Sequence, residues 1–530
     1  MEKLPTVRAE VMAKSSSGVF FFGFVTTGGR RERQTMKASN THGDHDVGRR
    51  HKIGMNEQHN TDEGYTADRH RNTDKRRFTE RRLIFAIALP IMIQRITNHF
   101  MLLVDRAFVG NLDARYLAAV GNVMVPFNAM LNTFFALATG LTVLVAHNAG
   151  RRDYTKARRL SQAAFFYFSL ISIGLFLLWF FGADRIFSLF GVSGEVRQYS
   201  SVYVRILSVY LIFFGIENAA ASILQGVGAT RPIMMSGVFR SVSNIFLDWL
   251  FIFGKWGFPA LGLAGAALAT VISNLLGVGL LFYSLFLREN LPFRLSLKAL
   301  FQPGWRLFQE TARVGIPSGL EILLYQSGQL VLVRLLNEID AMAIGIYTLV
   351  TSLQNLPVLL YMGFAKATMT MVGQYWGEER FAAAKGIAFY ALKVSVLTSA
   401  LGGLLFLLFP GVLLQLFTTD PGVVTRAAQL LRISGILLVF QSSNIVAGHA
   451  IRATGDTKWM LYSQIYGTLF VLGFSSFAIF CLNWGLIGVY LTTMLDEFFR
   501  GIVNFFRFYL GYNPLKKLKK AWMSSRMSSG

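Results

Sequence analysis

The chain contains two copies of one pattern, and both copies run through strongly apolar sequence. The first set of matched residues is spaced 227 positions apart: Pro90 and Pro317, Gly150 and Gly377, Gly228 and Gly455, and Thr230 and Thr457. Past one loop the spacing becomes 223, where Gly262, Gly265 and Thr270 match Gly485, Gly488 and Thr493. Duplicated bundles of apolar helices are typical of secondary transporters, which hold their substrate between the halves.

The apolar segments are long enough to cross a bilayer. The chain is 53% hydrophobic and only 15% charged, which excludes an ordinary soluble enzyme of 530 residues. Segments of about 20 apolar residues, enough to span a hydrocarbon core, recur along it. We predict an all-α polytopic membrane protein with twelve spans, at 83–104, 117–143, 161–181, 203–224, 233–253, 261–287, 314–336, 344–371, 386–409, 428–449, 459–482 and 485–510.

The two copies predict two lobes of like orientation. Each copy holds six spans, an even number, so both enter the membrane from the same side and a pseudo-two-fold axis along the membrane normal relates them. We expect an N-lobe at 81–287, a polar cytoplasmic linker at 288–313 and a C-lobe at 314–510. A central cleft between the lobes is then the expected pathway.

The basic surplus is mainly a topology signal. The net charge of +23 gathers in loops on one side of the predicted spans and in the tail at 511–530. Such loops face the cytoplasm. We therefore expect a multi-pass protein of the cell (inner) membrane with both termini cytoplasmic, and no nucleic-acid partner. Residues 1–80 lack apolar periodicity and are predicted to be disordered, and Met55 offers an alternative translation start.

Ionisable residues inside the predicted spans are the candidates for function, because charge in hydrocarbon is costly. Asp105 lies at the end of the first span, and Asn244 and Asp248 share one face of the fifth. Thr270 in the sixth span adds a hydroxyl. An all-oxygen set suits a hard cation such as Na⁺, and two close carboxylates also favour proton uptake. Each residue alone could equally be a structural hydrogen-bonding group, and the same holds for Glu217 in the fourth span.

The order of the motifs resembles the multidrug and toxic compound extrusion (MATE) family over about 83–510. The motifs are Ala88-Leu89-Pro90, Val104-Asp105, Phe108-Val109-Gly110, Ala146-His147-Asn148-Ala149-Gly150, its counterpart Val372-Gly373-Gln374-Tyr375-Trp376-Gly377, the turns 225–232 and 452–457, Asn244-Ile245-Phe246-Leu247-Asp248, and Gly265-Ala266-Ala267-Leu268-Ala269-Thr270. The resemblance implies a cation-coupled antiporter that exports small organic compounds by alternating access, without a cofactor beyond Na⁺ or H⁺. A monomer is expected.

The resemblance also implies roles for residues. An ion-coupling cluster would fall on Asp105, Asn244, Asp248 and Thr270, and Glu321 is the additional acid expected of a DinF-like C-lobe. Arg106 departs from the family pattern and is placed to pair with Asp105. Aromatic residues of spans that should border the cleft are candidates for substrate contact: Phe134, Tyr325, Tyr347 and Tyr361.

Other classes of function share some of these features. A lipid-linked oligosaccharide flippase has a similar architecture, usually with more spans and a more basic cleft. A facilitator-type transporter would need a glycine-aspartate-arginine loop that Gly150-Arg151-Arg152-Asp153 matches only faintly. A membrane-embedded enzyme would need a metal cluster or a nucleophile–base pair in the spans. At the 227 spacing Asp105 corresponds to Leu332 and Asp248 to Ser475, so we expect the carboxylate cluster in the N-lobe alone.

Overall fold

A computed structural model describes residues 50–110, 112–287, 291–296, 303–340 and 342–511. It divides into two units, residues 1–82 and 83–530. In the first unit the described part is helical from Arg50 onward, where the composition predicts an unstructured tail up to residue 80. Once a helix has nucleated, each added residue gains a hydrogen bond, so a polar stretch can extend it. Residues 1–49 and most of the predicted basic tail lie outside the described part.

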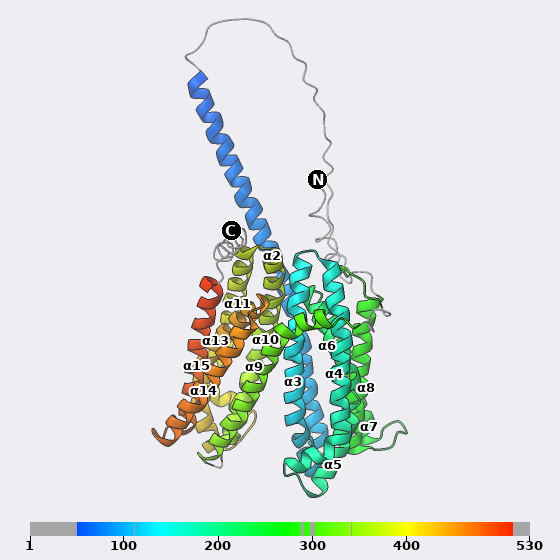
Figure 1. Ribbon diagram of the computed structural model, residues 1–530. Coiled ribbons are helices and arrows are strands. Elements are labelled where there is room, and N and C mark those ends of the chain that lie inside the picture. The colour runs from blue at the N-terminus through cyan, green and yellow to red at the C-terminus, as the bar shows by residue number, and fades with distance from the viewer. Residues whose placement is uncertain (1–49, 111, 288–290, 297–302, 341, 512–530) are drawn as a thin grey trace, which may run out of the picture. The chain divides into compact units, whose positions relative to one another are not determined.

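The predicted spans appear as helices in the same order. The N-lobe holds α2 (Arg50–Gly110), α3 (Ala114–Gly150), α4 (Tyr154–Leu189), α5 (Gly194–Ser208), α6 (Leu211–Gly226), α7 (Arg231–Phe253) and α8 (Gly262–Phe286). The C-lobe holds α9 (Trp305–Asn337), α10 (Ala343–Gly377), α11 (Phe381–Leu408), α12 (Pro410–Gln415), α13 (Pro421–Ala453), α14 (Thr457–Phe480) and α15 (Gly485–Gly511). Figure 1 shows both groups as bundles of steeply inclined helices.

Three of the predicted spans are unusual in the described structure. The fourth is broken into α5 and α6, which meet at 49°. Counting that pair once, ten described segments are long and apolar enough to cross a membrane. The other two, α7 and α15, carry ionisable residues along their length and complete the twelve. The all-α, two-bundle fold predicted from the sequence is confirmed.

The repeat is visible in the local backbone as well as in the order of helices. Gly228 follows α6 with a φ of +84°, and its counterpart Gly455 follows α13 with a φ of +90°. Glycine is favoured in this left-handed region because it has no Cβ. A further pair at the same spacing, Asp113 and Asp340, accepts hydrogen bonds from backbone nitrogens at the starts of α3 and α10.

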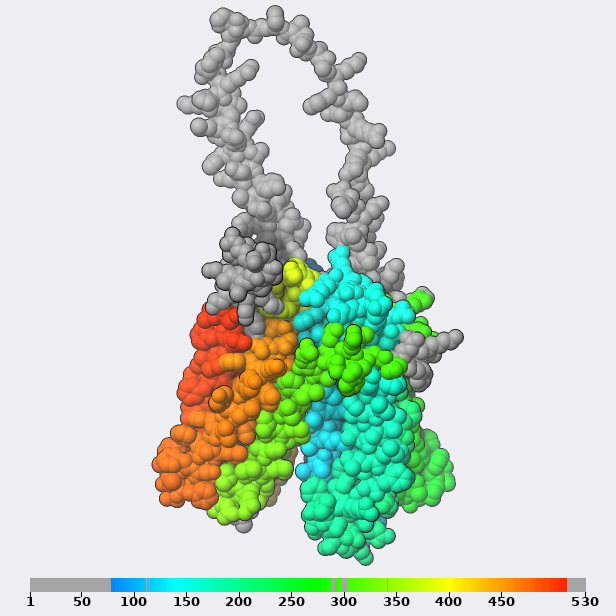
Figure 2. All heavy atoms as spheres, viewed as in Figure 1, coloured from blue at the N-terminus to red at the C-terminus, as the bar shows by residue number. Residues whose placement is uncertain are grey.

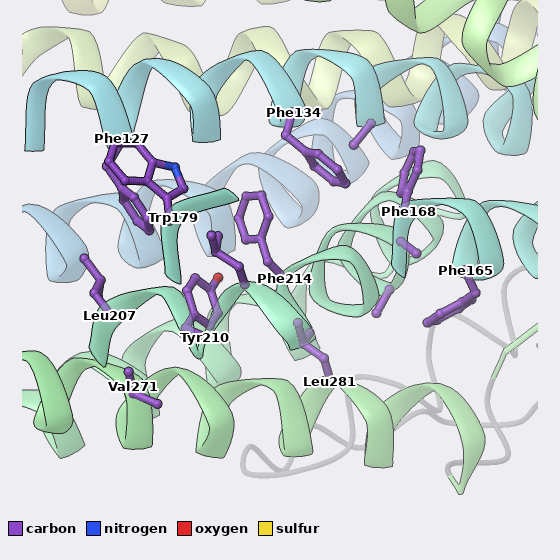
Figure 3. Packing of buried hydrophobic residues seen from close by; sticks show 14 of the residues in the cluster. Phe127, Phe134, Phe165, Phe168, Trp179, Leu207, Tyr210, Phe214, Val271 and Leu281 are labelled. Carbon is purple, nitrogen blue, oxygen red and sulfur yellow. The ribbon is translucent and has the colours of Figure 1, made fainter. Parts of the chain in front are cut away.

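Aromatic side chains fill the core of the N-lobe. Phe134 of α3 packs between Phe168 of α4 and Phe214 of α6, with ring centroids 5.3 Å and 5.0 Å away. Trp179 packs on Phe127 at one end of the same cluster, as Figure 3 shows. Offset and edge-on ring pairs such as these add to the gain from burying apolar area.

The lobes contact each other through glycines that match in the repeat. A Cβ atom on Gly150, at the end of α3, would collide with the carbonyl oxygen of Gln374 on α10. A Cβ on Gly377, at the end of α10, would collide in turn with the carbonyl oxygen of His147. Only hydrogen fits between backbones this close, so both positions require glycine for packing rather than for backbone conformation.

Polar contacts reinforce the same end of the interface. The Gln374 amide donates to the carbonyl oxygen of Gly226 at 3.0 Å, and the Thr370 hydroxyl donates to that of Gln225 at 3.1 Å. His147 Nε2 lies 2.6 Å from the carbonyl oxygen of Ala453. The lobes are therefore joined near the α3–α4 and α10–α11 connections. Figure 2 shows them diverging toward the opposite end.

The structure shortens the predicted linker. We expected a polar connection over 288–313, but α9 already begins at Trp305, and its first turns pack on the N-lobe. Phe308 stacks on Tyr167 with ring centroids 4.5 Å apart, and Lys156 forms an ion pair of 2.9 Å with Glu310. The apolar side of the first turns of α9 packs against α4, so the helix begins earlier than the polar composition of 288–313 suggested.

The close backbone contact at Gly377 predicts that an added methyl group there destabilises the protein, whereas the same change at a glycine in open space does not. Gly377→Ala should destabilise the protein by about 1–3 kcal/mol, because the added methyl meets backbone that cannot move aside. Gly386→Ala on α11 is the matched control, since nothing lies within 4 Å of its Cβ position. That change should be neutral or slightly stabilising. Thermal unfolding of the purified protein in detergent measures both, and equal stability of the two variants would contradict the packing argument.

Candidate functional site

Two carboxylates approach each other inside the N-lobe. Asp105 of α2 is 8% exposed and Asp248 of α7 is fully buried. The two side chains lie within electrostatic range of each other, and the buried Tyr203 of α5 lies within range of both. Three helices far apart in the sequence therefore bring two acids and a phenol into one small volume. This placement agrees with the pairing expected from the sequence.

These acids lack hydrogen-bond donors in the described structure. Both carboxylate oxygens of Asp248 and one of Asp105 are buried and accept no hydrogen bond from a described residue. The amide of Asn244, one turn before Asp248 on α7, is likewise buried and unbonded, as is the Ser241 hydroxyl. A buried polar atom without a partner costs about 1–3 kcal/mol, and more when it is charged. The cluster is thus built from oxygens that the protein itself does not satisfy.

Thr270 lies on the helix that packs against this face. Gly265 of α8 rests on the backbone of Phe251, and Leu250 and Phe251 form a small apolar cluster with Ala269. Asp248 and Thr270 are therefore at a similar depth on adjacent helices. The Thr270 hydroxyl donates to the carbonyl oxygen of Ala266 at 2.9 Å, which leaves its lone pairs as acceptors.

Arg106, the neighbour of Asp105 on α2, has an exposed side chain and forms neither a hydrogen bond nor an ion pair with Asp105 among the described residues. Successive residues on a helix point about 100° apart, so a buried Asp105 directs Arg106 away from the lobe interior. The two side chains nevertheless lie within electrostatic range of each other, as the sequence suggested. The acid pair thus has one cation nearby, on its exposed side and without direct contact.

Glu217, in contrast, is paired. Its carboxylate accepts a hydrogen bond from Tyr210 and forms a 2.8 Å ion pair with Arg240. The sequence did not single out Arg240. Arg240 also reaches the side-chain oxygens of Asn98 at 3.3 Å and Asn274 at 3.4 Å. Because Arg240, Asn244 and Asp248 are spaced by four, one face of α7 carries this network beside the acid pair.

The C-lobe holds a polar cluster of its own, which the sequence reading missed. Arg500 of α15 forms a 2.5 Å ion pair with Asp496 and donates to the side-chain oxygen of Gln464 on α14 at 3.1 Å. Glu497 accepts from Asn444 of α13 at 2.7 Å, and Asn444 accepts in turn from Asn504 at 2.8 Å. Two adjacent acids, Asp496 and Glu497, within an otherwise apolar predicted span were the sequence signal that could have indicated this cluster.

This cluster corrects the expectation of acids in the N-lobe alone. The comparison at the 227 spacing found no C-lobe counterpart for Asp105 or Asp248, because the C-lobe acids lie on α15, where the spacing is 223. There Asp496 corresponds to Ser273 and Glu497 to Asn274. The two lobes do differ, however, in how their acids are satisfied. Asp496 and Glu497 form ion pairs with Arg500, whereas Asp105 and Asp248 form none with a described residue, and the exposed Arg106 lies within electrostatic range of Asp105 without contacting it.

Glu321 is buried on α9 and forms an ion pair with Arg452 at the end of α13. Both nitrogens of one edge of the guanidinium contact the carboxylate, Nε at 3.3 Å to Oε2 and Nη2 to Oε1. A two-point contact of this kind fixes orientation as well as charge. The additional acid expected in the C-lobe is thus paired with a basic residue of the α13–α14 turn region.

A polar cavity of about 140 Å³ lies within the C-lobe. Tyr325, Tyr347 and Arg500 line it, and the Tyr347 hydroxyl donates to Gln329 at 3.2 Å. Tyr361, the third tyrosine expected at the cleft, is fully buried instead, and its hydroxyl donates to Gln441 at 2.8 Å. The sequence predicted the correct helix, α10. The Tyr361 side chain, however, lies on the face of α10 that packs against α13.

A larger, apolar crevice of about 910 Å³ separates the lobes where they diverge. It is bordered by α3, α4 and α9, and its only polar side chains are Asn122 and Thr133. Figure 2 shows the opening between α9 and α4. Phe134 borders this crevice but is only 4% exposed, because most of its ring lies in the N-lobe core.

Known proteins match this architecture. The MatE family model matches residues 90–250 and again residues 317–476, so the two matches start at Pro90 and Pro317. The chain belongs to the MatE family. The matched ranges cover more than half of the chain and reproduce the internal repeat.

Relatives and solved structures agree with this assignment. A probable multidrug resistance protein NorM from Thermotoga maritima is 27% identical over 80% of this chain and 91% of its own length. The multidrug export protein MepA of Staphylococcus haemolyticus is 26% identical over 77% and 89%. An outward-facing MATE family transporter of the MOP superfamily superposes with a TM-score of 0.77 at 23% identity, covering 83% of this chain and 97% of that one. MatE proteins are transporters, so this member is a multi-pass membrane transporter and not an enzyme.

The pairing of Glu217 predicts a coupled response to substitution. Arg240→Met should destabilise the MatE protein by about 3–5 kcal/mol, because it leaves a buried carboxylate uncompensated. Combining it with Glu217→Gln should recover much of that loss, since the residual charge is removed. Thermal unfolding of the single and double variants in detergent gives the coupling free energy between Glu217 and Arg240. Purely additive losses would show that the pair is not the reason these residues are buried.

Proposed function

We propose that this MatE protein is a secondary antiporter that exports organic compounds in exchange for Na⁺ or H⁺ entering through the N-lobe. The observation that carries the proposal is the acid pair of Asp105 and Asp248, whose buried oxygens receive no hydrogen bonds from described residues. Two ionised carboxylates in a membrane interior are strongly disfavoured unless a cation neutralises one of them. A Na⁺ ion or a proton does this, and its arrival or departure changes the energy of the whole lobe.

The residues around the pair suit either ion. Asn244 and Thr270 supply an amide oxygen and a hydroxyl oxygen, so a dehydrated Na⁺ would find uncharged oxygen ligands beside the carboxylates. A proton would need only Asp248 and its neighbour Asp105. In the C-lobe, Arg500 forms ion pairs with both adjacent acids and offsets one of their two negative charges, which is why we assign the coupling ion to the N-lobe.

The arrangement of the lobes supports alternating access. Contacts of Gly150 with Gln374 and of Gly377 with His147 join them at one end, and a crevice separates them toward the other. Basic residues such as Arg151, Arg158 and Lys385 lie near the joined end. By the positive-inside rule we propose that this end is cytoplasmic, so that both termini would lie in the cytoplasm and the crevice would open outward. Exchange then requires this contact to part while the opposite end closes.

The chemistry of the cavities favours amphipathic compounds. The apolar crevice can take ring systems, and the C-lobe cavity offers the phenols of Tyr325 and Tyr347. Aromatic faces also attract organic cations. Curated relatives are named for multidrug resistance or export, which agrees with a broad choice of substrate. We propose export by a single chain, acting as a monomer in the inner membrane.

Neutralising the buried acid should abolish coupling. Asp248→Asn keeps the size of the side chain but removes its charge, so it should lower ion-driven efflux from cells at least about tenfold with normal expression. Asp184→Asn is the matched control, because that aspartate lies in an exposed ion pair with Arg197. Drug susceptibility and immunoblotting of the membrane fraction measure both effects. Unchanged resistance with Asp248→Asn would remove this residue from the coupling site.

The coupling ion itself is tested with imposed gradients. Inside-out vesicles holding the protein should accumulate at least one compound of an organic cation panel when either a Na⁺ gradient or a pH gradient is applied. A response to Na⁺ alone that is lost in Thr270→Val would favour a Na⁺ site that uses the hydroxyl. A response to pH alone that survives this change would favour proton transfer. If neither gradient drives accumulation of any compound, the antiport proposal fails.

A further inference from the structure

Each lobe carries an arginine on the exposed face of a membrane-crossing helix, at matching positions of the repeat. Arg205 lies on α5 and Arg432 on α13, and the two are spaced by the same 227 positions as Pro90 and Pro317. Both side chains are exposed, and neither lines the crevice or the C-lobe cavity. A charged group on the outer surface of a span is costly unless it reaches a polar partner.

The part of the chain that the structure describes offers these two arginines no partner. Neither guanidinium group forms an ion pair or a hydrogen bond with a described residue. Other arginines of the same helices do: Arg197 of α5 pairs with Asp184 at 3.3 Å, and Arg426 of α13 pairs with Asp340. Acidic partners therefore occur near the starts of α5 and α13 but not at the matched arginines.

The two helices present the same pattern of side chains on this face. Residues spaced by three or four lie on one side of a helix. In both helices this side is polar near the start of the helix, then carries the arginine, and is apolar beyond it. The exposed or half-buried residues are Gln198, Val202, Arg205 and Val209 on α5, and Thr425, Gln429, Arg432 and Ile436 on α13. A change from polar to apolar marks the boundary between headgroups and hydrocarbon.

Helix length gives a similar depth. α5 begins at Gly194 and α13 at Pro421, so each arginine lies about three turns along its helix, or ~16 Å. The neighbouring α4, which ends just before α5 begins, has 36 residues. A helix of that length projects about 12 Å beyond each side of the hydrocarbon core. Each arginine is then a few ångströms inside the core, within reach of the headgroups at the end where the lobes diverge in Figure 1.

The helices beside the arginines carry apolar surfaces that also match in the repeat. α4 packs on α5, and α11 packs on α13. Four exposed side chains of each correspond at the 227 spacing: Leu170, Leu177, Leu178 and Phe181 on α4, and Leu397, Leu404, Leu405 and Leu408 on α11. A contiguous exposed apolar surface of this kind marks contact with a membrane. Each arginine therefore lies beside a surface that acyl chains cover.

We propose that Arg205 and Arg432 each bind the phosphate group of one phospholipid of the outer leaflet. A guanidinium group donates two parallel hydrogen bonds to phosphate oxygens, which a neutral headgroup without phosphate cannot accept. The acyl chains then lie along the exposed leucines of α4 or α11. Gln429, one turn from Arg432, adds an amide donor at the C-lobe site. The inference goes beyond the proposed export function, and only the choice of leaflet follows from the orientation proposed above.

Two bound headgroups at one depth have a consequence for the movement of the lobes. Each lobe has its own arginine, so each is tied to the same leaflet independently of the other. The lobes can then change their angle while neither sinks into or rises out of the membrane. A shift in depth would expose apolar surface or bury charge, which costs free energy.

Lipid binding to the full-length protein in detergent tests the proposal. Native mass spectrometry counts the lipids that stay bound as palmitoyl-oleoyl phosphatidylglycerol is added, and diacylglycerol with the same chains serves as the ligand without phosphate. We expect the wild type to retain more phosphatidylglycerol than diacylglycerol. Arg205→Gln and Arg432→Gln should each remove one tightly bound phosphatidylglycerol, with a loss of affinity at that site of about tenfold, and the double variant should lose two.

Arg185→Gln is the matched control. It removes the same charge from an exposed arginine one turn before the end of α4, outside the hydrocarbon core, and should leave the number of bound lipids unchanged. Size-exclusion profiles check that every variant folds. The proposal is overturned if the double variant retains as many lipids as the wild type, if Arg185→Gln loses as many as Arg205→Gln, or if diacylglycerol binds equally well. Displacement of phosphatidylglycerol by millimolar inorganic phosphate would instead assign the arginines to free phosphate and overturn the lipid as their ligand.

Discussion

The free-energy cost of placing charged groups in the hydrocarbon core of a membrane determines how the ionisable side chains of this protein are arranged. Most of its intramembrane ionisable groups are paired: Glu217 with Arg240, Glu321 with Arg452, and Asp496 and Glu497 with Arg500. Each pair links two or more turns or helices within a lobe, so it fixes helix positions as well as charge. Because these buried pairs are formed, a buried acid that forms no ion pair with a described residue is informative. The acid pair of the N-lobe is such a place.

The acid pair and the crevice between the lobes have different surroundings. Asp105 and Asp248 are buried inside one lobe, on α2 and α7, whereas the crevice bordered by α3, α4 and α9 is apolar. An antiporter needs two ligands with separate requirements. The structure supplies a separate candidate region for each.

Much of the fold follows from the sequence, because apolar length and repeated glycines are local signals. The spans and their order were predicted, as was the pairing of Asp105 with Asp248. Side-chain partners were harder to predict. Arg240 and Arg500 were overlooked because a single basic residue within a helix gives no periodic signal, and the acids of α15 were missed because the repeat changes spacing before that helix. Tyr361 was misplaced because a few tens of degrees around a helix decide between core and surface. Assignments that depend on which residue faces which need the packed structure.

The reciprocal contact of Gly150 and Gly377 also bears on how the two halves could have diverged. Each glycine is required by a backbone atom of the other half, Gln374 for Gly150 and His147 for Gly377. A side chain gained at either position cannot be offset by a smaller side chain opposite, because the obstacle is main chain. The acid positions inside the N-lobe face no such restriction from the other half, so Asp105 could be matched by Leu332 and Asp248 by Ser475. The halves were free to acquire different chemistry while the crossing that joins them had to stay the same in both.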